Sequence, residues 1–323
     1  MFRVSFVLGL VALGVSPAAA EVIEVSPSHI EAHERFLTSD ALRGRGSATN
    51  DEAVAAAYVA AQFQAFGLKP PPGTTAYLQS APVPATNYTR KIGIAEDART
   101  TNALGFLPGT DPKAGILLVT AHLDHLGMKD GKIFPGANDD ASGTVAVLEL
   151  ARVLAAKGPY RRGILFAAYG SEELGGVGST YFAAHPPVPL KDIAANIEFE
   201  MIGRPDPQLP AGSLMMTGFD RSNLGQSLKQ HGASVVPDPY PDQHFFERSD
   251  NYFLALHGVV AHTVSGWPLL PSYHQPSDTI DNLDLAFMAR SIQSLVEPVR
   301  WLADSDFRPA WNKGGAPKPQ RKE

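Results

Sequence analysis

The sequence predicts an α/β protein with a central, mostly parallel or mixed β-sheet and helices on both faces. Residues 116–121 (ILLVTA) and 163–169 (GILFAAY) are continuous apolar runs of strand length, as expected for buried central strands. Residues 141–156, which lie between them, carry a strong helix pattern. Buried strands that alternate with helices are typical of a sheet whose parallel strands are connected through helices.

Helices dominate the segment before the first apolar run. Residues 28–42 are predicted to form a short helix, and residues 44–47 (GRGS) a loop. Residues 52–66 repeat apolar side chains at helical spacing, so we predict a second helix there. Asp51 is its predicted N-cap, and Gly67 the residue that ends it.

The remaining elements are predicted from shorter patterns. Residues 69–75 hold three prolines and are predicted to be a connector. The other predicted strands are 79–82, 91–94, 193–202 and 259–264, and the other predicted helices are 250–256 and 282–302. The 323 residues are enough for two average domains or one large α/β domain. Because no internal repeat or long linker divides the chain, we treat residues 21–306 as one domain.

Both ends of the chain differ from this domain. Arg3, an apolar run over residues 4–15 and small residues up to Ala20 predict a secretory signal peptide, residues 1–20, cleaved after Ala20. The apolar run is too short for the ~20 residues of a membrane span. We therefore expect an exported protein, periplasmic or secreted, with no membrane span. Residues 307–323 are basic and rich in proline, and we expect a disordered tail there.

Composition excludes several classes of function. The net charge of −6 argues against a general nucleic-acid binder, which needs a basic face. The absence of cysteine excludes a disulfide framework, thiolate catalysis and iron–sulfur clusters, so any metal must be bound by His, Asp and Glu. A serine hydrolase and a nucleotide binder are disfavoured, because the chain has no G-x-S-x-G, P-loop or G-x-G-x-x-G motif.

Side chains that bind metals follow the predicted buried strands. They fall in five segments: TAHLDH (His122, Asp124, His125), GANDDASG (Asp139, Asp140), YGSEELGG (Glu172, Glu173), NIEFEMIG (Glu198, Glu200) and SYHQPSDT (His274). The carboxyl ends of strands form the ligand crevice of an open α/β sheet, so these segments could converge. Adjacent carboxylates in a cleft repel one another unless a cation lies between them. Imidazole with carboxylate and no sulfur suits catalytic zinc, with cobalt and manganese as competitors.

The segments that carry these residues resemble those of a known family. Five blocks, TAHLDHLG, GANDDASG, GSEELGGVGS, FEMIGR and SYHQPSDTIDN, are similar in sequence and order to the co-catalytic zinc aminopeptidases of metallopeptidase clan MH. That family includes bacterial leucyl aminopeptidase and the secreted Streptomyces aminopeptidase. The resemblance covers roughly residues 28–302. It implies the zinc exopeptidase fold in a single catalytic domain, without an inserted protease-associated domain, and two zinc ions per chain.

The resemblance also implies a set of metal ligands. They would be His122, Asp139, Glu173, Glu200 and His274. Asp139 would bridge both ions, and Asp124 would fix the tautomer of His122. Glu200 stands where many members have Asp, and this difference leaves its distances open. Glu198 lies two residues away in the same strand and points to the same face, so strand geometry alone does not decide between the two.

The implied activity is hydrolysis of the N-terminal residue of a peptide or small amide substrate with a free N-terminus. Glu172 would be the general base that takes the proton from a water shared by the metals and gives it to the leaving amine. Tyr273 would help to stabilise the oxyanion. Arg248 would contact the substrate, in a block (RSDN) where Asn251 replaces the family's His.

Several alternatives remain open. They are a carboxypeptidase, another amide hydrolase or aminoacyl cyclase on the same fold, and a non-catalytic binding protein. The cyclase is weaker because the ligands would supply two metals rather than one. His125 could reach the cleft as a ligand but is expected behind the ligands or at the surface, and Asp278 is expected to brace the turn after His274. The sequence does not determine the preferred side chain of the substrate or the oligomeric state.

Overall fold

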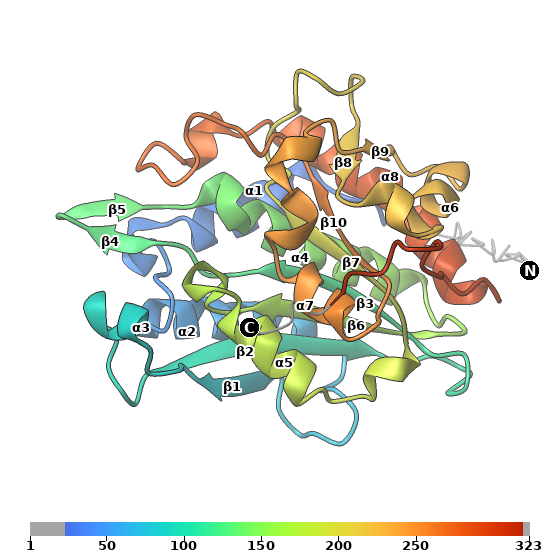
Figure 1. Ribbon diagram of the computed structural model, residues 1–323, viewed down its shortest axis with the longest axis horizontal. Helices are drawn as coiled ribbons and strands as arrows, with labels where there is room; N and C mark the ends of the chain where they lie inside the picture. The colour runs from blue at the N-terminus through green and yellow to red at the C-terminus, as the bar shows by residue number, and fades with distance from the viewer. Residues whose placement is uncertain (1–22, 319–323) are drawn as a thin grey trace, which may run out of the picture.

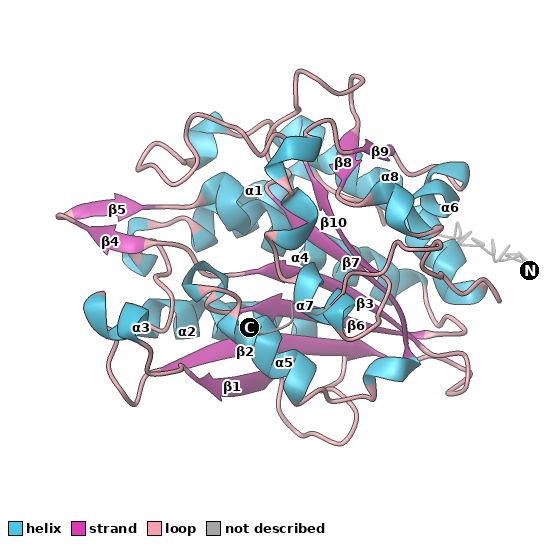
Figure 2. Cartoon of the chain, viewed as in Figure 1, coloured by secondary structure: helices cyan, strands magenta, loops and turns pink. Residues whose placement is uncertain are grey.

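The computed structural model describes residues 23–318, and its centre is one eight-stranded sheet covered by helices (Figures 1 and 2). The strands of this sheet are β1 (Leu78–Pro82), β2 (Arg99–Leu107), β3 (Ile116–His122), β6 (Gly163–Tyr169), β7 (Ile193–Glu200), β8 (Leu214–Met216), β9 (Val235–Pro237) and β10 (Ala261–Ser265). A separate hairpin of β4 (Gly127–Lys129) and β5 (Lys132–Phe134) projects from one end of the molecule (Figure 1).

The middle of the sheet is parallel and its edges are mixed. The strand order is β1-β2-β6-β3-β7-β10-β8-β9. Strands β6, β3, β7 and β10 run parallel to one another, whereas β2 is antiparallel to β6 and β8 is antiparallel to β10. The four parallel strands therefore end at one edge of the sheet. The predicted mixed α/β sheet is confirmed.

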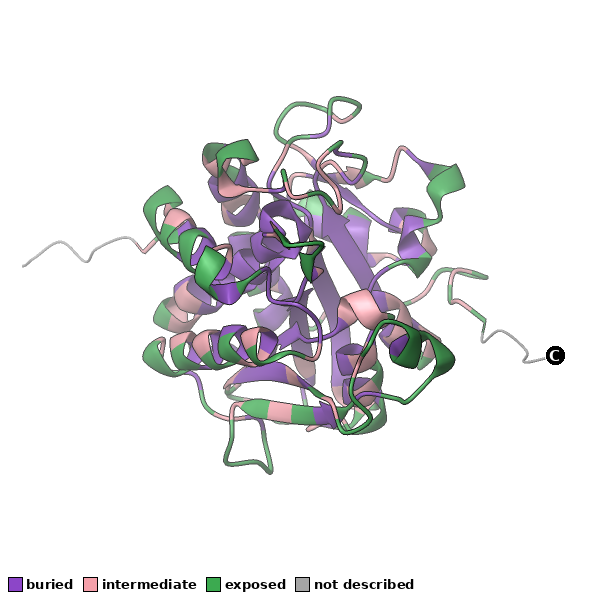
Figure 3. Cartoon of the chain, turned by 90° about the vertical axis from the view of Figure 1, so that its left-hand side faces the viewer, coloured by how far each residue is buried: buried purple, intermediate pink, exposed green. Residues whose placement is uncertain are grey.

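Helices cover both faces of the sheet, as predicted. They are α1 (Pro27–Leu37), α2 (Asn50–Ala65), α3 (Asn87–Lys91), α4 (Ser142–Lys157), α5 (Val177–Ala184), α6 (Leu224–Gln230), α7 (Asn251–Leu256) and α8 (Leu285–Asp304). On one face α4 contacts β3 and β7 and α2 contacts β2, while α1 and α8 pack on α4; on the other face α5 contacts β2 and α7 contacts β10. Seen from the end, the strands are buried between these helix layers (Figure 3). No inserted domain interrupts residues 23–318.

Burial on two faces explains the continuous apolar runs. In β3, Leu117 and Val119 belong to the core on the α4 side, while Leu118 belongs to the core on the α5 and α7 side. Phe166 and Leu165 of β6 divide in the same way. Each such side chain contributes roughly 1.5–3 kcal/mol when it is fully buried. A polar residue buried between them, such as Asn196 of β7, is hydrogen-bonded there, to the hydroxyl of Thr120. The strands of the centre are thereby held rigidly enough to position side chains at their ends.

Three local predictions are corrected by the structure. Residues 91–94 are not a strand: the hydroxyl of Thr86 accepts a hydrogen bond from the backbone N–H of Thr89 and caps α3 there. The strand that pairs with the edge strand β1 is instead β2. The first helix ends at Leu37 rather than Leu42. Helix α2 begins earlier than predicted, with Thr49 rather than Asp51 as its N-cap.

The described part of the predicted tail packs on the domain. Phe307 stacks on Trp301 of α8 with ring centroids 5.3 Å apart, and the indole N–H of Trp311 donates to the carbonyl of Gly258. Two aromatic side chains that gain buried contacts explain why this stretch departs from the expected disorder. The predicted signal peptide, residues 1–20, lies outside the described residues. None of the helices within residues 23–318 combines the length and apolarity needed to cross a bilayer.

Candidate metal centre

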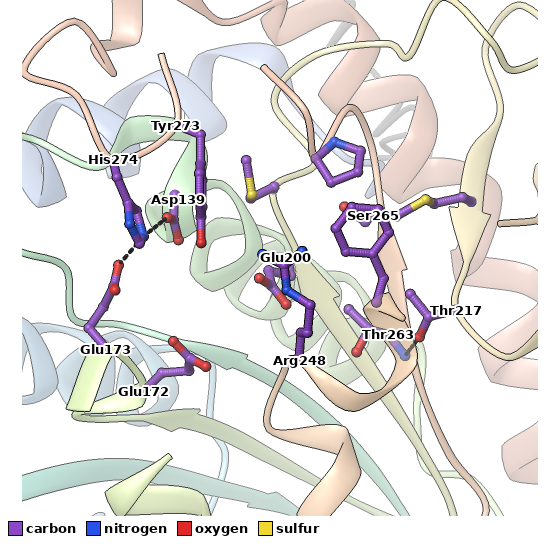
Figure 4. Close-up of a pocket in the computed structure, with 14 residues that line it drawn as sticks. Asp139, Glu172, Glu173, Glu200, Thr217, Arg248, Thr263, Ser265, Tyr273 and His274 are labelled. Carbon is purple, nitrogen blue, oxygen red and sulfur yellow. Dashed lines mark hydrogen bonds and ion pairs between the residues drawn. The ribbon is translucent and has the colours of Figure 1, made fainter. Parts of the chain in front are cut away.

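The predicted ligands meet at the edge where the parallel strands end. His122 is the last residue of β3, and Glu200 is the last residue of β7. A cavity of about 190 Å³ lies there, and Figure 4 shows the side chains around it. Among the predicted site residues, those that line it are Asp139, Glu172, Glu173, Glu200, Arg248, Tyr273 and His274. They come from loops that are up to 135 residues apart in sequence (274 minus 139).

Asp139 lies between two groups of donors. Its Oδ1 is 3.3 Å from Nε2 of His122, and its Oδ2 is 3.1 Å from Nε2 of His274. The same nitrogen of His274 is 3.1 Å from Oε1 of Glu173, as the dashed lines in Figure 4 show. One carboxylate that presents a different oxygen to each of two histidines has the arrangement of a ligand shared by two cations.

The donor set fits divalent cations. Among the described residues, both ring nitrogens of His122, Oδ2 of Asp139 and Oε1 of Glu173 are buried without a hydrogen-bond partner. Buried polar atoms without a partner are strongly unfavourable unless something else binds them. Burial lowers the pKa of His274, but the carboxylates of Asp139 and Glu173 outweigh burial and raise it to about 9. The acidic cluster thus attracts positive charge, which a metal ion supplies.

Asp124 acts through the loop that carries the two glutamates. Its Oδ1 accepts the backbone N–H of Glu172 at 2.9 Å, and its Oδ2 accepts that of Glu173 at 3.3 Å. The nearest approach to Nδ1 of His122 is 3.7 Å, too long for a hydrogen bond. Asp124 therefore lies where predicted, beside His122, but its hydrogen bonds position Glu172 and Glu173.

A buried arginine, which the sequence analysis did not single out, holds the ligand loops together. The Arg45 side chain is fully buried. Its guanidinium donates to backbone carbonyls of Leu123, between His122 and Asp124, and of Gly136, three residues before Asp139. Two further bonds reach the carbonyls of Leu37 and Pro135. Because guanidinium offers five donors in a rigid plane, one side chain can fix several loops at once.

The same segment also supports Asp124. The hydroxyl of Ser47 donates to Oδ2 of Asp124 at 2.6 Å, and the backbone of Gly46 pairs with that of His125. An arginine and a serine within a glycine-rich stretch (GRGS) were the only sequence signal for this support. The residues gain their role from burial, which the sequence does not display.

The loop of Asp139 is fixed from both sides. Asp278 accepts the backbone N–H groups of Asn138 and Asp139 at 2.9 and 3.0 Å, so its carboxylate braces this loop rather than the turn after His274. Asp140 is buried and accepts from the backbone of Met201, next to Glu200. Gly136 has a φ of +60°, and a Cβ there would lie 2.3 Å from the carbonyl oxygen of Asp139. Only glycine fits this position.

Glu172 lines the cavity from the loop after β6. It follows Ser171, whose φ of +55° turns the chain sharply after β6 and aims the next side chain into the cavity. Burial raises the pKa of Glu172 well above its usual range, and the nearby Asp250 adds to this effect. Non-glycine residues with positive φ concentrate at functional sites, and Met201 and His274 also have positive φ here.

The structure separates Glu198 from Glu200. Glu200 lines the cavity, whereas Glu198 is fully buried and accepts a hydrogen bond from the hydroxyl of Ser249 at 2.7 Å. Glu200 is thus the one that faces the other predicted ligands. The family's D-M-I-G pattern pointed to the same choice.

The cavity wall combines apolar and polar side chains. The guanidinium of Arg248 lies 4.9 Å from the ring centroid of Phe245, and the ring of Tyr273 stacks on His274 with centroids 3.8 Å apart. Two hydroxyl-bearing residues, Thr263 and Ser265, also line the cavity. His125, which was expected behind the ligands or at the surface, is fully buried beside the carboxylates of Asp139 and Glu173.

Sequence comparison identifies relatives of the chain. The profile of peptidase family M28 matches residues 102–297, more than half of the chain. The chain is 28% identical over 209 residues to the probable lipoprotein aminopeptidase LpqL of Mycobacterium tuberculosis; the match covers 54% of this chain and 40% of that protein. The chain therefore spans less than half the length of this curated relative.

Solved structures share the fold. The zinc aminopeptidase BSAP of Bacillus subtilis superposes with a TM-score of 0.67 at 19% identity, over 88% of this chain and 96% of that one. A glutaminyl cyclase of Bacteroides thetaiotaomicron superposes with a TM-score of 0.62 at 17% identity, over 87% and 99%. The predicted zinc exopeptidase fold and the predicted resemblance are confirmed. The chain belongs to peptidase family M28.

Proposed function

We propose that this chain is a zinc-dependent aminopeptidase that holds two metal ions and removes N-terminal residues from peptides. The observation that carries the proposal is the position of Asp139, whose two oxygens face His122 on one side and His274 on the other. Family membership supports a metallopeptidase, and the names of the relatives support an aminopeptidase that uses zinc.

The residues divide into two metal positions. His122, Asp139 and Glu200 would hold one ion, and Asp139, Glu173 and His274 the other. When bound, the ions would supply Lewis acidity that polarises the scissile carbonyl and activates the attacking water. Glu172 lines the cavity beside Glu173, and its carboxylate accepts no hydrogen bond from the described residues. Its raised pKa suits a group that accepts a proton and passes it to the leaving amine.

The names of the relatives favour an aminopeptidase over a carboxypeptidase. Four acidic side chains line the cavity, Asp139, Glu172, Glu173 and Glu200, and two divalent cations would offset their charge. The cavity of about 190 Å³ is also smaller than the ~300–1,000 Å³ of sites for larger ligands, which suits one terminal residue.

The phenol of Tyr273 and the guanidinium of Arg248 are the groups that would contact substrate. Both line the cavity, and Tyr273 is held against His274 by stacking. Tyr273 would donate to the oxyanion and Arg248 would contact the peptide. We further propose that the protein is exported, as the predicted signal peptide implies; a relative named as a lipoprotein supports this.

A panel of peptides tests the proposed reaction. The purified protein is incubated with peptides that have a free amine, a blocked N-terminus or a blocked C-terminus, with and without a chelator, and the products are identified by mass spectrometry. We expect release of the N-terminal residue from free-amine and C-blocked peptides only, abolished by the chelator and restored by zinc. The metal content should be close to two ions per chain.

Other outcomes would replace the proposal. Cleavage that requires a free C-terminus would assign a carboxypeptidase, and release of ammonia from N-terminal glutamine without peptide cleavage would assign a cyclase. Activity in metal-free protein would contradict the metal mechanism. Failure on every substrate with two metals bound would favour a binding protein on this scaffold.

A further inference from the structure

His125 occupies a position that the ligand set above leaves unexplained. It lies three residues after His122, in the loop that leaves β3, and its side chain is fully buried. Its Nδ1 is 3.0 Å from Oε1 of Glu173 and 3.8 Å from Oδ2 of Asp139. These are the two oxygens that also face His274.

The close contact between His125 and Glu173 does not have the geometry of a hydrogen bond. Among the described residues neither ring nitrogen of His125 has a hydrogen-bond partner, and Oε1 of Glu173 has none either. At 3.0 Å, the ring nitrogen and the oxygen are near each other without the N–H pointing at the oxygen. A buried imidazole left in this state is strongly destabilising, whereas a shared cation would satisfy both groups.

The spacing of the three groups matches that of ligands on one ion. Zinc lies about 2.0–2.2 Å from nitrogen and oxygen ligands, which places neighbouring ligand atoms of a tetrahedron roughly 3.4 Å apart. The two distances from Nδ1 of His125, 3.0 and 3.8 Å, bracket this value. One ligand atom each from His125, Asp139 and Glu173 lie within 4.8 Å of one another.

Two imidazoles thus flank one pair of carboxylates. His125 approaches from the interior and has no exposed surface, whereas the side chain of His274 is 34% exposed. Their rings are 5.6 Å apart between centroids and inclined by 65°. His125, Asp139 and Glu173 therefore form a complete three-ligand set without His274.

The backbone around His125 is fixed in a way that keeps its ring in place. Its N–H donates to the carbonyl of Arg45, and its carbonyl accepts the N–H of Ser47. Gly136 lies against the ring, and a Cβ there would come within 2.4 Å of it. The ring is consequently held against the two carboxylates from behind.

We propose that His125 is a buried ligand of the metal ion held by Asp139 and Glu173, so that this position binds its ion from the interior independently of His274. The proposal rests on the metal centre proposed above. It makes the two metal positions unequal: one has an additional imidazole from the interior, and the other has only His122. A divalent ion that accepts imidazole and carboxylate, such as zinc, cobalt or cadmium, is the class of ligand expected.

Nuclear magnetic resonance of cadmium-substituted protein tests this ligation directly. The full protein is labelled with ¹⁵N-histidine and loaded with two equivalents of ¹¹³Cd²⁺, and histidine nitrogens bonded to the metal are detected by their one-bond coupling to cadmium. We expect couplings from His122, His125 and His274. The coupling at Nδ1 of His125 is assigned by its absence in His125→Gln. Coupling at His122 and His274 alone would overturn the proposal.

Metal titration of variants gives a second measurement. In competition with a chromophoric chelator for zinc, His274→Ala should keep two ions per chain at micromolar free zinc, and His125→Gln/His274→Ala should keep one. His125→Gln should lower the affinity for one of the two ions. The decrease should exceed the ~10–100-fold that is typical when a residue that only hydrogen-bonds to a metal ligand is removed. His33→Gln, which removes another buried histidine whose Nδ1 is hydrogen-bonded with the hydroxyl of Tyr58, should change neither value.

The outcomes separate this inference from the proposed function. An unchanged affinity in His125→Gln, or loss of the ion in His274→Ala alone, would overturn the additional ligand. Neither readout uses a substrate. A protein that is silent on every peptide but shows the coupling at His125 would refute the aminopeptidase and retain the ligand.

Discussion

The two halves of the metal centre are held in different ways. The inner half consists of the loops after β3 and β6 together with Asp139, and its histidines, His122 and His125, are at most 1% exposed. The outer loop, residues 266–284, carries Tyr273 and His274, and the side chain of His274 is 34% exposed. Its backbone combines turns of its own, such as the bond from the N–H of Tyr273 to the carbonyl of Leu270, with bonds to the segment after β7, such as that from the N–H of Gly266 to the carbonyl of Met201. The inner half is fixed before any ligand binds, whereas the outer loop borders the opening of the cavity.

This difference assigns separate tasks to the two halves. Preorganised donors stabilise a transition state without having to rearrange, which suits the inner half. An exposed loop with a ligand and an aromatic side chain can adjust to the incoming peptide. Asp278 is the main link between the two, because it belongs to the outer loop but binds the backbone of Asn138 and Asp139.

The largest effect is expected where both halves depend on one side chain. Asp139→Ala removes the carboxylate between His122 and His274, so both ions should be lost and activity should fall at least a thousandfold, equivalent to about 4 kcal/mol. Metal analysis and melting curves with and without chelator are the measurements. Melting of the variant should no longer respond to the chelator, because metal binding and folding are linked. Wild-type metal content in this variant would contradict the shared position.

The next largest effect is expected on catalysis, with metal binding unchanged. Glu172→Gln keeps the shape of the side chain but cannot accept a proton, so kcat should fall by roughly 10²–10⁴-fold while two ions remain bound. Steady-state kinetics and metal analysis of the same preparation are required. Near-normal turnover would remove Glu172 from the role of base, and loss of an ion would make it a ligand.

Two arginine variants compare how much the hydrogen bonds to the inner half and to the outer loop contribute to stability. Arg45→Met removes a buried guanidinium from four backbone carbonyls and should destabilise the protein by at least about 3 kcal/mol, since each such bond contributes ~1.5–3 kcal/mol. Arg204→Met removes an exposed bond to the carbonyl of Asn282 in the outer loop and should change stability by about 0.5 kcal/mol or less.

Chemical denaturation of the metal-free proteins measures both variants. Arg45→Met should also weaken zinc binding, which is measured by chelator competition. Equal effects of the two substitutions would show that the two halves are supported equally, contrary to the comparison above.

The smallest expected effect is a pH dependence of the protein's stability, which arises from the carboxyl group of Glu52. Glu52 is buried, and its carboxylate accepts hydrogen bonds from the hydroxyls of Thr100 and Ser171. Burial, with Asp124 nearby, raises its pKa from 4.5 to about 8. The folded state therefore binds the proton more tightly than the unfolded state, so the stability contributed by this group is full below pH 4.5 and is lost as the pH rises through about 8.

Glu52→Gln removes this dependence. At pH 5 the variant and the wild type should unfold at similar denaturant concentrations, and at pH 9 the variant should be more stable by about 1–3 kcal/mol. Denaturation at several pH values measures the difference. A variant that loses stability at pH 9 would show that Glu52 is needed in its charged form.

The sequence predicted the parts of the fold in which one pattern dominates. The central strands were evident because burial on both faces requires continuous apolar residues, as in β3 and β6. Strand β2 was missed because Thr100 and Asn102 interrupt its apolar pattern; both are buried by hydrogen bonds to side chains and backbone that come from distant segments. A short apolar stretch such as 91–94 does not distinguish a strand from a capped turn.

The candidate site shows the same limit. Motif blocks placed Asp139, Glu173 and His274, because residue type and order carry the information. The motifs gave no role to Arg45 and left three positions open for His125: among the ligands, behind them or at the surface. The first depends on four carbonyls from helix α1 and two loops, and the second on a glycine, Gly136, that makes room for the ring. Such relations exist only once the chain has folded.

The support that residues 44–47 (GRGS) give to the metal centre limits how far the chain can be shortened. The region matched to the family begins at residue 102, yet Arg45 and Ser47 lie more than fifty residues ahead of it. A protein trimmed to the matched region would contain every proposed ligand and would still lack the clamp that sets their spacing. A shortened chain therefore has to keep Arg45 and Ser47 together with the matched region.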